Sequence, residues 1–90
     1  MMTDVDVVLD ERGKQYGVFA KHAAITQAMK AIARAAPSWD DCDDDMKEAI
    51  EMILHKIGRI LNGDPKVVDS WVDIAGYSKL VADRLEGVSR

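Results

Sequence analysis

The segment DMKEAIEMILHKIGRILNGDPKVVDSWVDIAGYSKLVADRL (residues 45–85) decides the fold. Apolar residues recur every three or four positions on both sides of its NGDP turn, which is the pattern of two amphipathic helices. Asn62 and Gly63 predict a left-handed helix end, and Asp64 with Pro65 predicts an N-cap followed by the first residue of the next helix. Because the turn is short, the two helices should form an antiparallel hairpin.

The first half of the chain also has a helical pattern. Thr3 and Asp6 stand at capping-box spacing, and glycines weaken the far end of the helix that they begin. A second helix is predicted over about 18–35, since Pro37 cannot continue it.

The third helix follows an acidic stretch, SWDDCDDD (38–45), and is expected to begin where Asp45 and Glu48 make a second capping-box pair. No segment alternates as a strand does. The sequence therefore predicts an all-α protein: one domain over residues 1–90, a small bundle of about four helices. A chain this short buries a modest core, so we expect it to be completed as a homo-oligomer.

The composition narrows the classes of function. Twelve basic and sixteen acidic side chains give a net charge of −4, which argues against a general nucleic-acid or membrane-surface binder. The single cysteine, Cys42, allows no disulfide within the chain. The first residues lack a signal-peptide pattern, and no stretch approaches the roughly 20 apolar residues of a membrane span. We therefore expect a cytoplasmic protein.

Two acidic pairs carry the functional hypothesis. Glu48 and Glu51 share one face of the third helix, and Asp69 and Asp73 share one face of the fourth. Four carboxylates that converge between antiparallel helices would bind a divalent cation such as Mg²⁺ beside a polyphosphate. The alternative is that they belong to solvated helix surface.

Further polar residues follow the first pair on the third helix. His55 and Arg59 continue its face at steps of four, and Lys56 lies beside them, so that carboxylates, an imidazole and cations are neighbours. That combination suits a site that holds metal and phosphate together, although i,i+4 pairs on a plain exposed face would look the same.

The face with Asp69 and Asp73 also contains Gly76 and Leu80. A glycine inside a helix costs about 1 kcal/mol relative to alanine, and it is retained where another group approaches closely. We therefore expect this face to be covered, and a partner chain is one candidate for the cover.

An earlier segment, ERGKQYG (11–17), offers Tyr16 to stack on a base and Arg12 or Lys14 to meet phosphate, or it is a plain helix terminus. His22 falls among apolar residues and is more typical of a packing or surface histidine than of a ligand.

Three motifs, ERGKQYG, EAIEMILHKIGRILNGDP (48–65) and DSWVDIAGYSKL (69–80), resemble a family of small phage and prophage proteins known as a domain of unknown function. The resemblance covers most of the chain and implies a phage setting without an activity.

A looser resemblance is to the all-α nucleotide pyrophosphohydrolases of the MazG type. These place an E-x-x-E pair on one helix and an E-x-x-D pair on the next, bind magnesium, and cleave nucleoside triphosphates in dimers or tetramers. Glu48 and Glu51 match the first pair, whereas Asp69 and Asp73 are four residues apart and Lys47 stands where a further glutamate often precedes.

The leading hypothesis is a Mg²⁺-dependent nucleotide pyrophosphohydrolase, and the alternative is a non-enzymatic phage protein that binds a nucleotide or a host partner. A helical module without a small ligand is a third possibility. The hypothesis assigns the metal to the four carboxylates and catalysis to Glu48, Glu51 and His55. Phosphate and base contacts are assigned to Lys56, Arg59, Lys79 and Tyr16.

Overall fold

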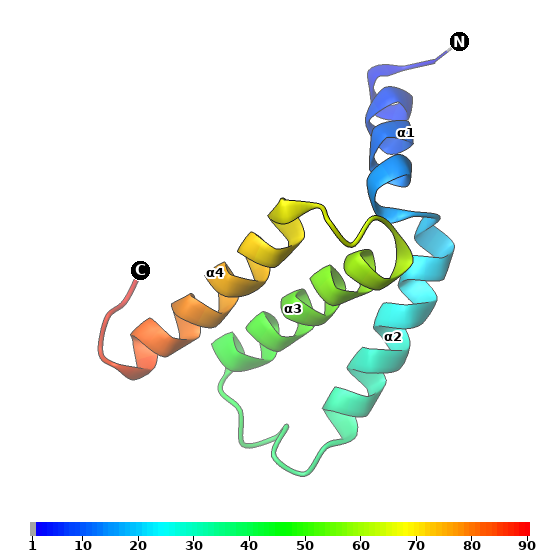
Figure 1. Ribbon diagram of the computed structural model, residues 1–90. Coiled ribbons are helices and arrows are strands. Elements are labelled where there is room, and N and C mark those ends of the chain that lie inside the picture. Colours follow the sequence, from blue (N-terminus) through cyan, green and yellow to red (C-terminus); the bar gives the residue numbers. More distant parts are fainter. Residues whose placement is uncertain (1) are drawn as a thin grey trace.

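The structure is a computed structural model that describes residues 2–90, and it confirms the all-α class. Four helices and their connections account for these residues (Figure 1). The helices are α1 (Asp4–Tyr16), α2 (Phe19–Ala35), α3 (Asp44–Asn62) and α4 (Val68–Leu85).

The predicted start of α1 is confirmed. The Thr3 hydroxyl accepts a hydrogen bond from the Asp6 amide at 3.2 Å, and the Asp6 carboxylate accepts one from the Thr3 amide at 2.9 Å. These bonds stabilise the charged carboxylate and lower the pKa of Asp6. The predicted start of α3 is wrong by two residues, because Asp43 is its N-cap and Asp45 instead binds Arg84.

The prediction for the NGDP turn is wrong in two details. Gly63 has a φ of −125°, so α3 does not end in the left-handed conformation. Asp64 accepts a hydrogen bond from the Lys66 amide at 2.9 Å and forms a turn, and α4 begins only at Val68. The Pro65 carbonyl accepts a hydrogen bond from the Trp71 indole at 2.9 Å, which fixes that ring on the turn.

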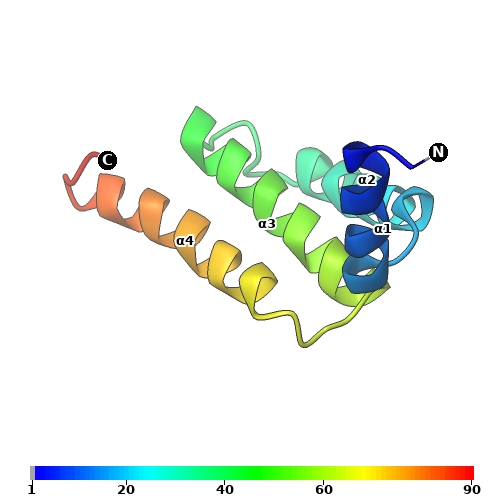
Figure 2. The same ribbon diagram turned by 90° about the horizontal axis from the view of Figure 1, so that it is seen from above.

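The helix α3 lies between α2 and α4, as Figures 1 and 2 show. Each neighbour runs antiparallel to it, which confirms the predicted hairpin of α3 and α4. Within residues 2–90, α2 and α4 make no contact with each other. The three helices therefore form one open layer, with α3 in the middle and a broad face on each side.

Small residues mark the places where α3 meets its neighbours. Its only buried residues are Ala49 and Gly58, whereas Leu61, in the stripe of apolar residues at three- to four-residue spacing that predicted the helix, is 65% exposed. The other members of that stripe are half-buried: Met46, Ile50, Ile53, Ile57 and Ile60. A core centred on them, as the sequence predicted, is therefore not closed within one chain.

Ion pairs border the contact between α3 and α4 on one side. Lys56 Nζ lies 3.0 Å from Asp73 Oδ2, and Arg84 binds Asp45 and, at 2.8 Å, Asp43. These hydrogen bonds lower the pKa of Asp45 and raise that of Arg84. The apolar stripe of α3, and Trp71 and Leu85 of α4, lie on the other side of the contact, so the open layer has a polar face and an apolar face.

The helix α1 projects from this layer and is held at its C-terminal end (Figure 1). Gly17 follows it with a φ of +78°, a region that favours glycine. The side-chain amide of Asn62 donates 3.0 Å hydrogen bonds from Nδ2 to the backbone carbonyls of Tyr16 and Val18, on both sides of Gly17. A Cβ atom at Gly63 would overlap the backbone of Tyr16. This joint fixes Tyr16 relative to α3.

We expect opposite effects of alanine at two glycines, one in this joint and the other inside α4. Gly63→Ala should lower the free energy of unfolding by about 1–3 kcal/mol, because its methyl group has no room. Gly76→Ala, inside α4 with open space around it, should raise that free energy by about 0.5–1 kcal/mol. Urea unfolding followed by circular dichroism measures both. Equal stability of the two variants would contradict the close contact at Gly63.

Candidate functional site

A cavity of about 460 Å³ lies where the end of α1 meets α2 and α3. The joint at Gly17 turns the chain from α1 into α2 at its rim, so both helices contribute to its wall. Leu9, Val18 and Phe19 make part of that wall apolar. The volume lies in the range of small-molecule sites, which is about 300–1,000 Å³.

Two histidines from different helices meet in the cavity. His22 Nε2 and His55 Nδ1 lie 3.3 Å apart, and the rings meet edge to face with centroids 4.6 Å apart. Burial, the neighbouring His22 and then Arg59 lower the pKa of His55 from 6.5 to about 4. Burial also lowers the pKa of His22. Both rings are therefore neutral at pH 7, and one of them donates its single N–H to the other across the 3.3 Å contact.

Close helix packing holds His22 in place. The residue is 6% exposed, and a Cβ atom at Gly58 would lie 3.1 Å from its ring and overlap the Thr26 methyl group. Thr26 donates its hydroxyl hydrogen bond back to the His22 carbonyl. His22 Nδ1 is buried without a hydrogen-bond partner among residues 2–90. Glycine at position 58 thus brings α2 near enough for the two rings to touch.

Two guanidinium groups give the cavity a positive charge. Arg59 stacks on Tyr16, with Cζ 4.4 Å from the ring centroid, and Arg12 lines the same cavity from α1. Within residues 2–90 neither arginine forms an ion pair, and no carboxylate lines the cavity. Uncompensated cations beside neutral hydrogen-bond donors attract an anion.

The structure brings together only part of the predicted binding set. Tyr16, His55 and Arg59 share the cavity. Lys56 does not line it and pairs with Asp73. Lys79 lies on α4 and binds Asp83, with Nζ–Oδ distances of 2.9 and 3.1 Å.

The predicted metal-binding carboxylates are dispersed in the single chain. Glu51 pairs with Arg34 on α2, and Asp73 pairs with Lys56 on α3. Glu48 and Asp69 are exposed. Among residues 2–90, no three His, Cys, Asp or Glu side chains gather closely enough to hold one metal ion. The four carboxylates of one chain therefore do not converge in the way that the metal hypothesis expects.

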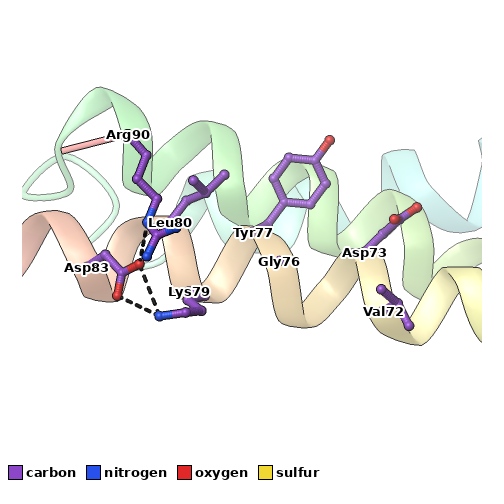
Figure 3. Close-up of a pocket in the computed structure, with 8 residues that line it drawn as sticks. All are labelled: Val72, Asp73, Gly76, Tyr77, Lys79, Leu80, Asp83 and Arg90. Carbon is purple, nitrogen blue, oxygen red and sulfur yellow. Dashed lines mark hydrogen bonds and ion pairs between the residues drawn. The ribbon is translucent and has the colours of Figure 1, made fainter. Parts of the chain in front are cut away.

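A second hollow, of about 560 Å³, follows α4 around Gly76 (Figure 3). Asp83 is buried there between Lys79 and Arg90, and these bonds lower its pKa, with Lys79 the larger cause. Leu80 and Tyr77 also line this hollow. The expected cover over Gly76 and Leu80 is not supplied by residues 2–90, since nothing approaches the position of a Cβ atom at Gly76.

Sequence reasoning missed two residues of the cavity. His22 is a buried packing residue, as the sequence suggested, but it also lines the cavity beside His55. No motif singles out Phe19, yet it is 67% exposed at the cavity. The spacing of His22 and Thr26 marks the α2 face that meets α3, and this was the available signal.

Comparison with known families places the chain. The model of the family described as Domain of unknown function (DUF6378) matches residues 1–85, so the chain belongs to this family. The search of curated proteins and the search of solved structures gave no match. None of the helices within residues 2–90 is long and apolar enough to cross a membrane.

The lowered pKa values of the histidines predict a pH dependence of stability. A histidine whose pKa is lower in the folded state takes up protons more readily when unfolded, so stability is lost as the pH falls. For His55 this loss spans the range from 6.5 to about 4. The urea midpoint of the wild type should fall across this range.

His55→Gln should make the profile less steep between pH 6.5 and about 4, because glutamine does not titrate and only the contribution of His22 remains. Loss of stability confined to lower pH belongs to carboxylates such as Asp45, whose pKa lies below 3.8. An unchanged slope in the variant would contradict the assignment to His55.

Proposed function

We propose that this protein binds a nucleotide or a related phosphorylated aromatic molecule in the cavity between α1, α2 and α3. One observation carries the proposal: Arg12 and Arg59 line a cavity that contains two neutral histidines and no carboxylate. This is the binding alternative raised by the sequence, now supported by a specific location.

The phosphate would meet the two guanidinium groups. Arginine binds phosphate oxygens through paired N–H donors, and the Tyr16 ring restricts the orientation of Arg59 before the ligand arrives. His55 would donate a further hydrogen bond from Nε2, in the tautomer in which its Nδ1 accepts the hydrogen bond of His22 Nε2. A neutral donor suits a phosphate whose charge is already balanced by two arginines.

The aromatic part of the ligand would pack on Phe19. One face of Tyr16 is occupied by Arg59, whereas the Phe19 ring is 67% exposed at the cavity. Stacking of a base on an aromatic side chain contributes about 1–3 kcal/mol. The proposed stacking residue is thus Phe19 rather than Tyr16, which the sequence suggested.

Calorimetric titration with ATP in EDTA tests the proposal, because binding by arginines and rings needs no metal ion. Arg59→Gln should weaken ATP binding about 10–100-fold, since a hydrogen bond to a charged group contributes about 1.5–3 kcal/mol. Lys79→Gln is the matched control and should bind as the wild type does, because Lys79 lies outside the cavity. Failure of ATP, GTP, AMP and GMP to bind the wild type would contradict the proposal.

A second candidate is Mg²⁺-dependent pyrophosphohydrolysis of a nucleoside triphosphate. The ion pair of Lys56 with Asp73 favours it, because this pair holds a carboxylate of the second acidic pair against α3. Helical geometry puts Glu48 on the same side of α3 as Arg59. Magnesium that arrives with a polyphosphate is bound by one or two protein carboxylates in many enzymes.

Product analysis separates the two candidates. If the protein is a hydrolase, ATP and other triphosphates with Mg²⁺ should yield monophosphate and pyrophosphate. Glu51→Ala and Asp73→Ala should abolish that turnover without loss of helical circular dichroism. Full activity of both variants would exclude the predicted carboxylate roles, and recovery of intact ATP from a tight complex would favour binding alone.

The setting of this function is part of the proposal. The resemblance of the three motifs to phage and prophage proteins supports a role in an infected or lysogenic bacterium. A nucleotide ligand would be met in the host cytoplasm.

A further inference from the structure

One face of the open layer is apolar over all three of its helices. On α3, the side toward α4 is marked by Lys56 and Asp45, and the side toward α2 by Gly58. Between these sides lie Glu48 and Arg59 in one direction around the helix and the apolar stripe in the other. The stripe therefore faces out of the layer, opposite the polar residues.

The neighbouring helices continue this apolar face. On α4, the ion-paired Asp73 and Arg84 lie at the polar border of the contact, so the flank that carries Trp71 and Leu85 lies on the same side as the α3 stripe. On α2, Ile32 occupies the corresponding flank, away from the ion-paired Arg34. Helical domains bury such a face against a second layer of helices.

The chain exposes more surface than a compact monomer of the same mass. A monomeric protein of 10.0 kDa exposes about 5,200 Å², whereas this chain exposes 6398 Å². The radius of gyration is 15.3 Å, compared with about 12 Å for a compact domain of this length. The excess is roughly 1,200 Å², to which the projecting helix α1 also contributes, and each partner of a standard interface buries about 800 Å².

We propose that a second copy of this chain covers the apolar face, which makes a two-layer dimer with the two α3 stripes packed against each other. The face is suited to a copy of itself, because the stripes on α3 and α4 contain no charged residue to select a different partner. A two-fold axis through such a patch makes it complementary to itself. The ligand cavity and the acidic residues of α3 lie on the opposite face and stay accessible.

Trp71 would be an anchor of this interface. Its indole N–H is already bound to the Pro65 carbonyl, while the residue is 55% exposed. Burial of an aromatic ring that is already oriented and hydrogen-bonded costs little conformational entropy or desolvation, and it gains apolar contact. Residues of this kind are common among interface hot spots.

Sedimentation equilibrium at 1–200 µM tests the proposal with two matched leucines. The wild type should have twice the chain mass. Leu61→Glu, on the apolar face and 65% exposed in the single chain, should weaken the dimer at least 100-fold. Leu80→Glu, 49% exposed on the opposite flank of α4, should leave the dimer intact.

Fluorescence of Trp71 in a Trp39→Phe background provides a second measurement that does not depend on the folding of the leucine variants. Its emission should shift to longer wavelength as the protein is diluted and the dimer dissociates. A wild type that stays at 10.0 kDa with concentration-independent emission would overturn the proposal. A dimer that Leu80→Glu dissociates would overturn it as well.

Discussion

The close approach of α2 to α3 at Gly58 is the constraint on which the rest of the structure depends. No side chain separates the helices there, so His22 and Thr26 pack directly on the α3 backbone. This contact brings His22 against His55 and forms the floor of the cavity. The large apolar residues of α3 lie to the side of this contact, where most of them are only half-buried. The proposed ligand cavity and the open apolar face thus lie on either side of the same contact between α2 and α3.

The joint at Asn62 adds the second half of the site. By bonding to the carbonyls on both sides of Gly17, Asn62 holds the end of α1 so that Tyr16 meets Arg59. Residues far apart in the sequence therefore build one positively charged cavity, although the whole chain carries a net charge of −4. The acidic side chains lie elsewhere, and several are compensated by their own partners, as Glu51 is by Arg34. Separation of charge on this scale would allow a small acidic protein to bind an anion.

The sequence predicted the four helices, their ends to within a few residues, and the hairpin of α3 and α4, because amphipathic periodicity and caps are local signals. It misplaced the start of α4, since Asp64 can cap either a helix or a turn, and here its carboxylate accepts the Lys66 amide in a turn on which the Trp71 indole also bonds. It named Tyr16, His55 and Arg59 for the site and took His22 for a packing or surface residue, without its contact with His55. Which face of α2 meets α3 depends on Gly58, a long-range contact that local patterns do not encode.

The most direct test of the ligand cavity uses the only two histidines of the chain. Long-range ¹H–¹⁵N spectra of the imidazole rings report both nitrogens of His22 and His55 without interference from other residues. At pH 7 we expect both rings to be neutral. Their resonances should shift as ATP is added and should reach a plateau at saturation. Imidazole signals that stay unchanged at saturating ATP, or rings that are protonated at pH 7, would contradict it.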